Sequence, residues 1–111
     1  MEKEEFDIIK IKLSLIVYNC LYSNKLLFRT DRDLAVHNES SLASELGVRK
    51  ATVTDLLYCK SLPSTKTIFL ILNAFKISFS DFAKMFDKIN DKEAIDHIKN
   101  ISHKMDVLKN L

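Results

Sequence analysis

Few residues of this chain have the types and spacing that catalysis requires. The histidines, His37, His97 and His103, lie in unrelated contexts, and His97 and His103 do not share the i, i+4 face of a helical metal pair. The cysteines, Cys20 and Cys59, form no metal or redox motif, which is typical of free thiols in a reduced cytoplasm. A single glycine leaves no Gly-rich loop for a phosphate. We therefore expect no enzyme, no metal and no cofactor.

The most informative pattern lies in residues 39–58, where two short helices with a tight turn between them are predicted. Helices joined in this way cross steeply and need a small side chain where their backbones approach, and Ala43 stands there. Gly47 suits a turn with positive φ, and Val48 supplies the apolar plug that follows it. The inner faces are completed by Leu42, Leu46, Val53 and Leu56. This order of residues predicts a helix-turn-helix.

The stretch resembles the helix-turn-helix of the lambda-repressor-like family, which includes Cro, the phage repressors and the XRE group. The resemblance continues to Phe82, with Pro63 in the loop before the next helix and a closing passage at 73–82. It implies an all-α domain whose second motif helix enters the major groove of double-stranded DNA. The function implied is that of a sequence-specific transcriptional regulator, a repressor acting as a homodimer.

The resemblance also assigns roles to individual residues. Those placed near base edges are Lys50, Ala51, Thr54 and Asp55. Lys50 would donate to guanine O6 or N7, and the methyl group of Ala51 or Thr54 would meet a thymine methyl. Asp55 would either accept from the amino group of cytosine or face solvent without contacting a base. Phosphate contacts, which set affinity without reading sequence, are expected from Ser40, Ser41, Arg49, Thr52, Lys60, Ser61 and Lys66. Glu39 stands where many members of the family read a base with glutamine.

The chain departs from the family in two places. Leu57-Tyr58-Cys59 replaces a glycine-containing helix end, and a residue other than glycine with positive φ costs roughly 1 kcal/mol there. An insertion of residues 23–38 separates the first helix from the motif, and Arg29 and Arg32 could add DNA contacts. Within it, Thr30 followed by Asp31 and Asp33 predicts a helix start.

The elements that position the motif are predicted to be helices throughout, because the chain has one glycine and one proline. An extended first helix, about Glu4–Tyr22, carries two apolar stripes: Phe6, Ile9, Leu13, Ile16 and Cys20, and Ile8, Ile11, Leu15, Tyr18 and Tyr22. Such a helix is usually covered on two sides, by the core and by either the C-terminal helix or a second subunit. Later helices begin near Ser64 or Thr65 and near Ser78 or Ser80, with Phe82, Met85 and Phe86 pointing inward.

The C-terminal segment has a heptad-like pattern, formed by Ala94, Ile98, Ile101, Met105 and Leu108. We expect a helix-turn-helix domain at 1–88 and a C-terminal helix at 89–111. Ile98, Ile101, Met105 and Leu108 are predicted to form a dimer interface. The alternative is a helix that folds back on its own domain.

Composition leaves the partner open. The 111 residues suit one compact helical bundle, and the net charge of +2 is weak evidence for a polyanionic partner. The apolar run 13–18 is too short to cross a bilayer, so a cytoplasmic protein without a membrane is expected. The rival to DNA binding is a protein-binding module of the same fold, such as an antitoxin, an anti-repressor or a mobile-element scaffold, with a regulatory protein partner.

Overall fold

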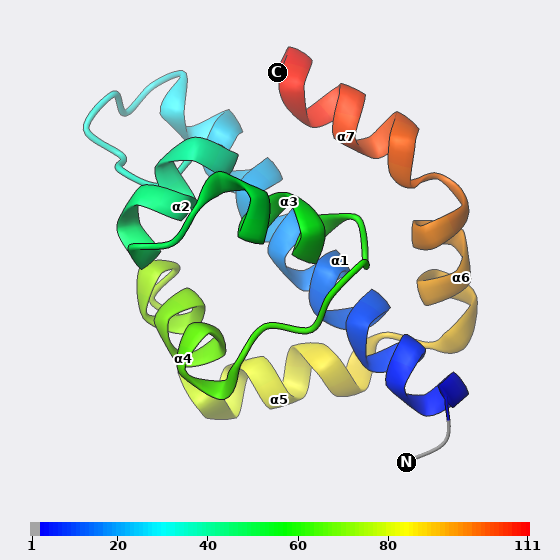
Figure 1. Cartoon of the computed structure of the whole chain (residues 1–111). Coiled ribbons are helices and arrows are strands. Elements are labelled where there is room, and N and C mark those ends of the chain that lie inside the picture. Colours follow the sequence, from blue (N-terminus) through cyan, green and yellow to red (C-terminus); the bar gives the residue numbers. More distant parts are fainter. Residues whose placement is uncertain (1–2) are drawn as a thin grey trace.

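The N-terminal helix α1 (Lys3–Phe28) lies at the centre of the fold, and six further helices surround it (Figure 1). This computed structural model describes residues 3–111, with side chains from Asp7 onward. The other helices are α2 (Glu39–Leu46), α3 (Lys50–Leu57), α4 (Thr65–Ala74), α5 (Phe79–Lys88), α6 (Asp91–Lys99) and α7 (Ile101–Asn110). The expected all-α bundle with a helix-turn-helix is confirmed, and the described residues contain no strand.

Helix α1 is buried around its whole circumference in its middle. All six residues from Leu13 to Tyr18 are buried, and successive residues on a helix point about 100° apart. The helix packs against α6 and α3, and to a smaller extent against α5 and α7. The expectation that α1 is covered on two sides is confirmed, and the second cover comes from the C-terminal helices. Phe6, which was placed in one apolar stripe, lies outside the described side chains.

The residues predicted to form the inner faces of α2 and α3 are in the main core. Leu42, Ala43, Leu46, Val53 and Leu56 are all buried there, and Val48 packs against them. Asn38 caps α2: its side chain accepts a bond from the Ser41 N–H, while the Ser41 hydroxyl accepts from the Asn38 N–H. Side-chain caps on Ser64 and Ser78 begin α4 and α5.

Three helices end on a residue in the left-handed region. Gly47 after α2 has φ 69°, Cys59 after α3 has φ 62° and Lys76 after α4 has φ 57°. In each case the next N–H bonds a carbonyl five residues back, from Val48 to Ala43, from Lys60 to Asp55 and from Ile77 to Leu72. This is the hydrogen-bond pattern of a Schellman end. The departure at Cys59 is therefore a strained version of the same turn.

The helix predicted to start at Thr30 is absent, because α1 runs to Phe28 and residues 29–38 form a loop. The Asp31 carboxylate accepts from the Asp33 N–H, which closes a local turn, and the Thr30 hydroxyl donates back to Leu27 O. The loop is held at its base, where the rings of Phe28 and His37 stack with centroids 3.8 Å apart. Leu26 and Leu27 complete the last turns of α1.

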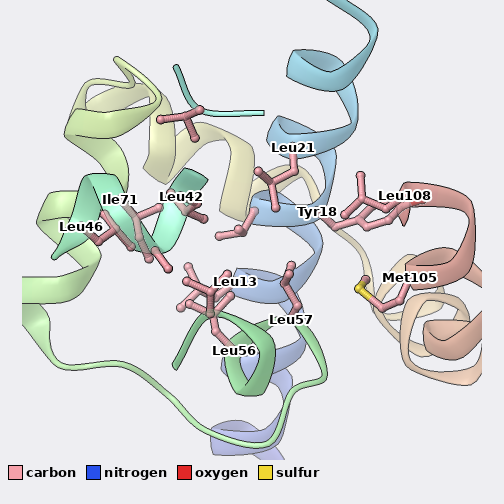
Figure 2. Close-up of a cluster of buried hydrophobic side chains, with 14 residues drawn as sticks. Leu13, Tyr18, Leu21, Leu42, Leu46, Leu56, Leu57, Ile71, Met105 and Leu108 are labelled. Carbon is pink, nitrogen blue, oxygen red and sulfur yellow. The ribbon is translucent and has the colours of Figure 1, made fainter. Parts of the chain in front are cut away.

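The segment predicted as one C-terminal helix is two helices, α6 and α7, which meet at Asn100. Met105 and Leu108 are buried in the main core, and Ala94 is buried in a second cluster with Leu15 and Ile16 of α1. In Figure 2, Met105 and Leu108 point from α7 toward Leu57 and Tyr18. Residues 89–111 thus fold back on their own domain, the second of the two arrangements considered.

Candidate nucleic-acid interface

Helix α3 presents its predicted base-reading positions to solvent. Lys50 and Ala51 are exposed, and Thr54 and Asp55 are partly exposed, whereas Val53, Leu56 and Leu57 on the opposite face are buried. Arg49 precedes the helix and is exposed, and its side chain forms no cap. The described chain therefore leaves the first turn of α3 open to a ligand.

Glu39 connects the two helices of the motif. The Thr54 hydroxyl lies 3.1 Å from Glu39 Oε2 and 3.2 Å from Lys50 O, so its one proton serves either acceptor. This contact fixes the start of α2 against the middle of α3. It also occupies the carboxylate at the position where the family resemblance expected a base-reading glutamine. A positioning role for Glu39 follows from this geometry.

The residues predicted to contact phosphate separate into two groups. Ser41 is occupied by the capping of α2, since its hydroxyl donates to Asn38 O and accepts from the N–H groups of His37 and Asn38. Its hydroxyl proton is therefore engaged within the free chain, and the phosphate contact of Ser41 stays a prediction. The others are exposed or partly exposed, namely Ser40, Arg49, Thr52, Lys60, Ser61 and Lys66.

Two lysines at the motif were missed by sequence reasoning. A hollow of about 240 Å³ lies beside the starts of α2 and α3, and its lining includes Lys25, Ser40, Lys50 and Lys109. Lys25 comes from the end of α1 and donates to Leu108 O at the end of α7. The folding back of α7 brings Lys109 to this place, and no local pattern in the sequence indicated it. The hollow brings these three lysines and the Glu39 carboxylate together beside the N-terminus of α2, where a helix already favours anions.

A buried chain of hydrogen bonds reaches α3 from the C-terminal helices. The Ser14 hydroxyl donates to Leu57 O, and His97 Nε2 lies 2.8 Å from Ser14 Oγ. Lys104 Nζ lies 3.0 Å from His97 Nδ1. Because the hydroxyl proton is used on Leu57 and the ammonium can only donate, His97 is neutral with its proton on Nε2. Burial and the neighbouring Lys104 charge lower the pKa of His97 to about 4.

This serine and histidine do not form a usable nucleophile. Ser14 and His97 are both fully buried, and the serine proton is committed to the backbone carbonyl of Leu57. A substrate carbonyl has no access to the Ser14 oxygen in this arrangement. The chain of bonds instead holds the last residue of α3 to α1, α6 and α7.

Other kinds of site receive no support from the part of the chain that the structure describes. No three His, Cys, Asp or Glu side chains come together as metal ligands among residues 7–111, whose side chains the structure describes. Within the same range, every helix is too short or too polar to span a bilayer. Burial raises the pKa of the Cys20 thiol to about 11, and it also raises that of Cys59.

Comparisons with known proteins bring no match. No protein-family model matches the chain, and neither does any curated protein or solved structure.

Proposed function

We propose that this chain is a sequence-specific DNA-binding protein of the lambda-repressor-like type, which acts in the cytoplasm as a transcriptional repressor. The observation that carries the proposal is the exposed outer face of α3. Lys50 and Ala51 stand free at its start, and its inner face is anchored in the core through Val53, Leu56 and Leu57. A rigid helix with an open face is what entry into a major groove requires.

The charges around α3 support the same proposal. Lys25, Lys50 and Lys109 line the hollow at the starts of α2 and α3, and Arg49 is exposed next to it. Lys60 is exposed beyond the other end of α3. Cations on both sides of a helix suit the two phosphate backbones that border a groove. In this arrangement Lys50 contacts a base edge, while the other basic residues contact the phosphate backbones of the DNA.

The rival function is a protein-binding module that keeps this fold, and Asp55 and the low net charge favour it. A carboxylate on the open face of α3 would face phosphates at close range. The two functions differ in salt dependence, because phosphate binding releases counterions and weakens steeply as salt rises.

Fluorescence anisotropy with a random-sequence duplex across a salt series tests the proposal. We expect binding at low salt that weakens steeply as the salt concentration rises. Absence of binding at low salt, or binding without a salt slope, would contradict DNA binding and favour the protein-binding module.

Selection of bound sequences from a random pool then separates base reading from phosphate contact. Lys50→Ala should relax preference at one base-pair position, with a loss of about 1–3 kcal/mol for the preferred site. Lys60→Ala and Lys109→Ala should weaken all sequences alike and lower the salt slope by about 1 each. Lys92→Ala, which removes an exposed lysine of α6, is the matched control and should change neither. Equal, indiscriminate losses from Lys50→Ala and Lys60→Ala would remove Lys50 from the base-reading role.

A further inference from the structure

A hollow of about 550 Å³ opens between α1, the end of α4 and α5. Its volume is within the range of about 300–1,000 Å³ that small-molecule sites have. Asn19 and Ser23 line it on α1, whereas Ser14 is the residue of α1 that bonds to α3. At about 100° per residue along a helix, Asn19 and Ser23 point about 140° and 180° away from Ser14. The hollow therefore lies on a different side of α1 from the helix that we propose enters DNA.

One wall of the hollow is apolar. Phe75 and Ile77 come from the turn that ends α4, and Met85 comes from α5. Phe75 packs against the main core, whereas Cys20 and Met85 pack against the second cluster, so the hollow opens between the edges of the two clusters. Because burial raises the pKa of the Cys20 thiol to about 11, the thiol adds no negative charge to this wall. A ligand with an apolar body would remove these side chains from water.

Helix α5 gives one side to the second cluster and another to the hollow. The sequence predicted that Phe82, Met85 and Phe86 point inward, and all three pack against the second cluster, although none of the ten residues of α5 is buried. Lys84 and Lys88 are one turn apart on the side that lines the hollow. Their two ammonium groups can therefore reach the same ligand.

The rim of the hollow is cationic. Lys76, Lys84 and Lys88 line it, together with one acid, Asp81. All three lysines are exposed, and among residues 7–111 no group forms a hydrogen bond or an ion pair with their ammonium nitrogens. The side chains of these lysines are thus available to an anion from solution.

Three other hollows differ from this one in charge or in apolar surface. A neighbouring hollow, which shares Lys76, is lined by Asp31, Asp33 and Glu45. A hollow of about 230 Å³ on the phenylalanine side of α5 has Asp87 and no lysine. The hollow at the starts of α2 and α3 has three lysines but a single apolar residue. Of the four, the hollow between α1, α4 and α5 is the one that combines several cations with an apolar wall.

We propose that this hollow binds a small organic acid that carries an apolar body. The acid group lies at Lys84 and Lys88, and the apolar body covers Phe75, Ile77 and Met85. The three carboxylates beyond Lys76 repel a negative charge, which keeps the acid group at the α5 end of the hollow. The hydroxyl and amide groups on the α1 side offer neutral hydrogen bonds to the same ligand.

The exposure of the lysines indicates a modest affinity. Ion pairs in contact with solvent contribute little and are screened by salt, so the apolar contact supplies most of the binding energy. For a compact aromatic acid we expect a dissociation constant of about 1 mM or below.

An NMR titration of the full chain with 3-phenylpropanoate, in the absence of DNA, tests the proposal. The backbone amides of residues 75–77 and 81–88 should shift, whereas those of α3 should not. The neutral amide 3-phenylpropanamide has the same apolar body and should bind roughly threefold more weakly or worse. Absence of shifts at the hollow, or shifts confined to the phenylalanine side of α5, would overturn the site. Equal affinity for the acid and the amide would overturn the role of the lysines.

Two charge variants locate the acid group. Lys84→Gln and Lys88→Gln should each weaken 3-phenylpropanoate about threefold and leave the affinity for 3-phenylpropanamide unchanged. Lys92→Gln, at an exposed lysine of α6 outside the hollow, is the matched control and should affect neither probe. The same affinity for the acid in all three variants would remove the acid group from the two lysines of α5.

A filled hollow provides the last check. Ser23→Trp places a large side chain in the hollow and should weaken both probes about tenfold or more. Leu27→Trp, one turn further along α1 and outside the hollow, is the matched control and should change neither affinity. Both residues are exposed, so circular dichroism should show an unchanged fold. Undiminished binding to Ser23→Trp would overturn the proposal. The hollow shares no residue with the predicted DNA contacts, so these outcomes are independent of the proposed DNA binding.

Discussion

Glycine in the left-handed position that ends a helix avoids the conformational penalty that a side chain incurs there. Of the three helices that end in this way, only α2 has a glycine at that position. Lys76 occupies the equivalent position after α4 and is exposed. We expect Lys76→Gly to raise the free energy of unfolding by up to about 1 kcal/mol, because relief of strain outweighs the added freedom of the unfolded chain. Urea unfolding measures this change.

Gly47→Ala is the reverse experiment. A Cβ at Gly47 meets no atom within 4 Å, so the substitution introduces backbone strain without a clash. The free energy of unfolding should fall by about 1 kcal/mol. A gain from Gly47→Ala, or a loss from Lys76→Gly, would contradict the strain argument.

His97 makes stability depend on pH. Its pKa falls from 6.5 to about 4 on folding, so between these values the unfolded chain binds a proton that the folded chain does not. The stabilisation is complete above about pH 6.5 and is lost as pH falls through 4. The groups that face the ring are Ser14, Tyr18 and Lys104. None of the three is a carboxylate that would favour the protonated ring.

His97→Gln should flatten the pH dependence of the thermal midpoint between pH 6.5 and 4. Glutamine donates to Ser14 and accepts from Lys104 without titrating in this range. His103→Gln, at an exposed histidine of α7, is the control for general charge effects. Identical pH profiles for the His97 and His103 variants would exclude the buried ring as the cause.

At the scale of elements, α7 is a structural part of the domain. Met105 is fully buried in the main core. Met105→Ala should lower the free energy of unfolding by about 2–5 kcal/mol, the usual cost of a cavity at such a position. Ile95→Ala, at a residue 48% exposed on α6, should cost about 0.5 kcal/mol or less. Chemical denaturation gives both values. A negligible loss from Met105→Ala would mean that α7 is detached from the domain in solution.

The elements differ in how far the sequence predicted them. The turn between α2 and α3 and the inner faces of both helices follow from local rules, which is why Gly47 and Val53 were placed correctly. The C-terminal heptad pattern predicted only that one side of residues 94–108 is buried. Contact with α1 buries that side as well as contact with a second subunit would. Thr30 and Asp31 failed as a helix start because the same side chains also close short turns. Lys109 was missed because it reaches the motif only through the folding back of α7.

At the scale of the whole molecule, one core joins both ends of the chain. Leu13 and Val17 of α1 share a cluster with Leu57 of α3 and with Met105 and Leu108 of α7. The second cluster joins Leu15 and Ile16 to Ile89 and Ala94. The motif is therefore supported by residues from the whole length of the chain. A fragment limited to residues 39–82, where the family resemblance lies, would lack α1 and α7, whose side chains pack with α3 in this cluster.

The burial of α1 by later helices has a consequence during synthesis on the ribosome. Leu15 and Ile16 are made early, but their cover at Ile89 and Ala94 is translated more than 70 residues later. At about 5–20 residues per second, the nascent chain exposes these side chains for several seconds or longer. The apolar middle of α1 therefore stays without its native cover until the last helices have left the exit tunnel.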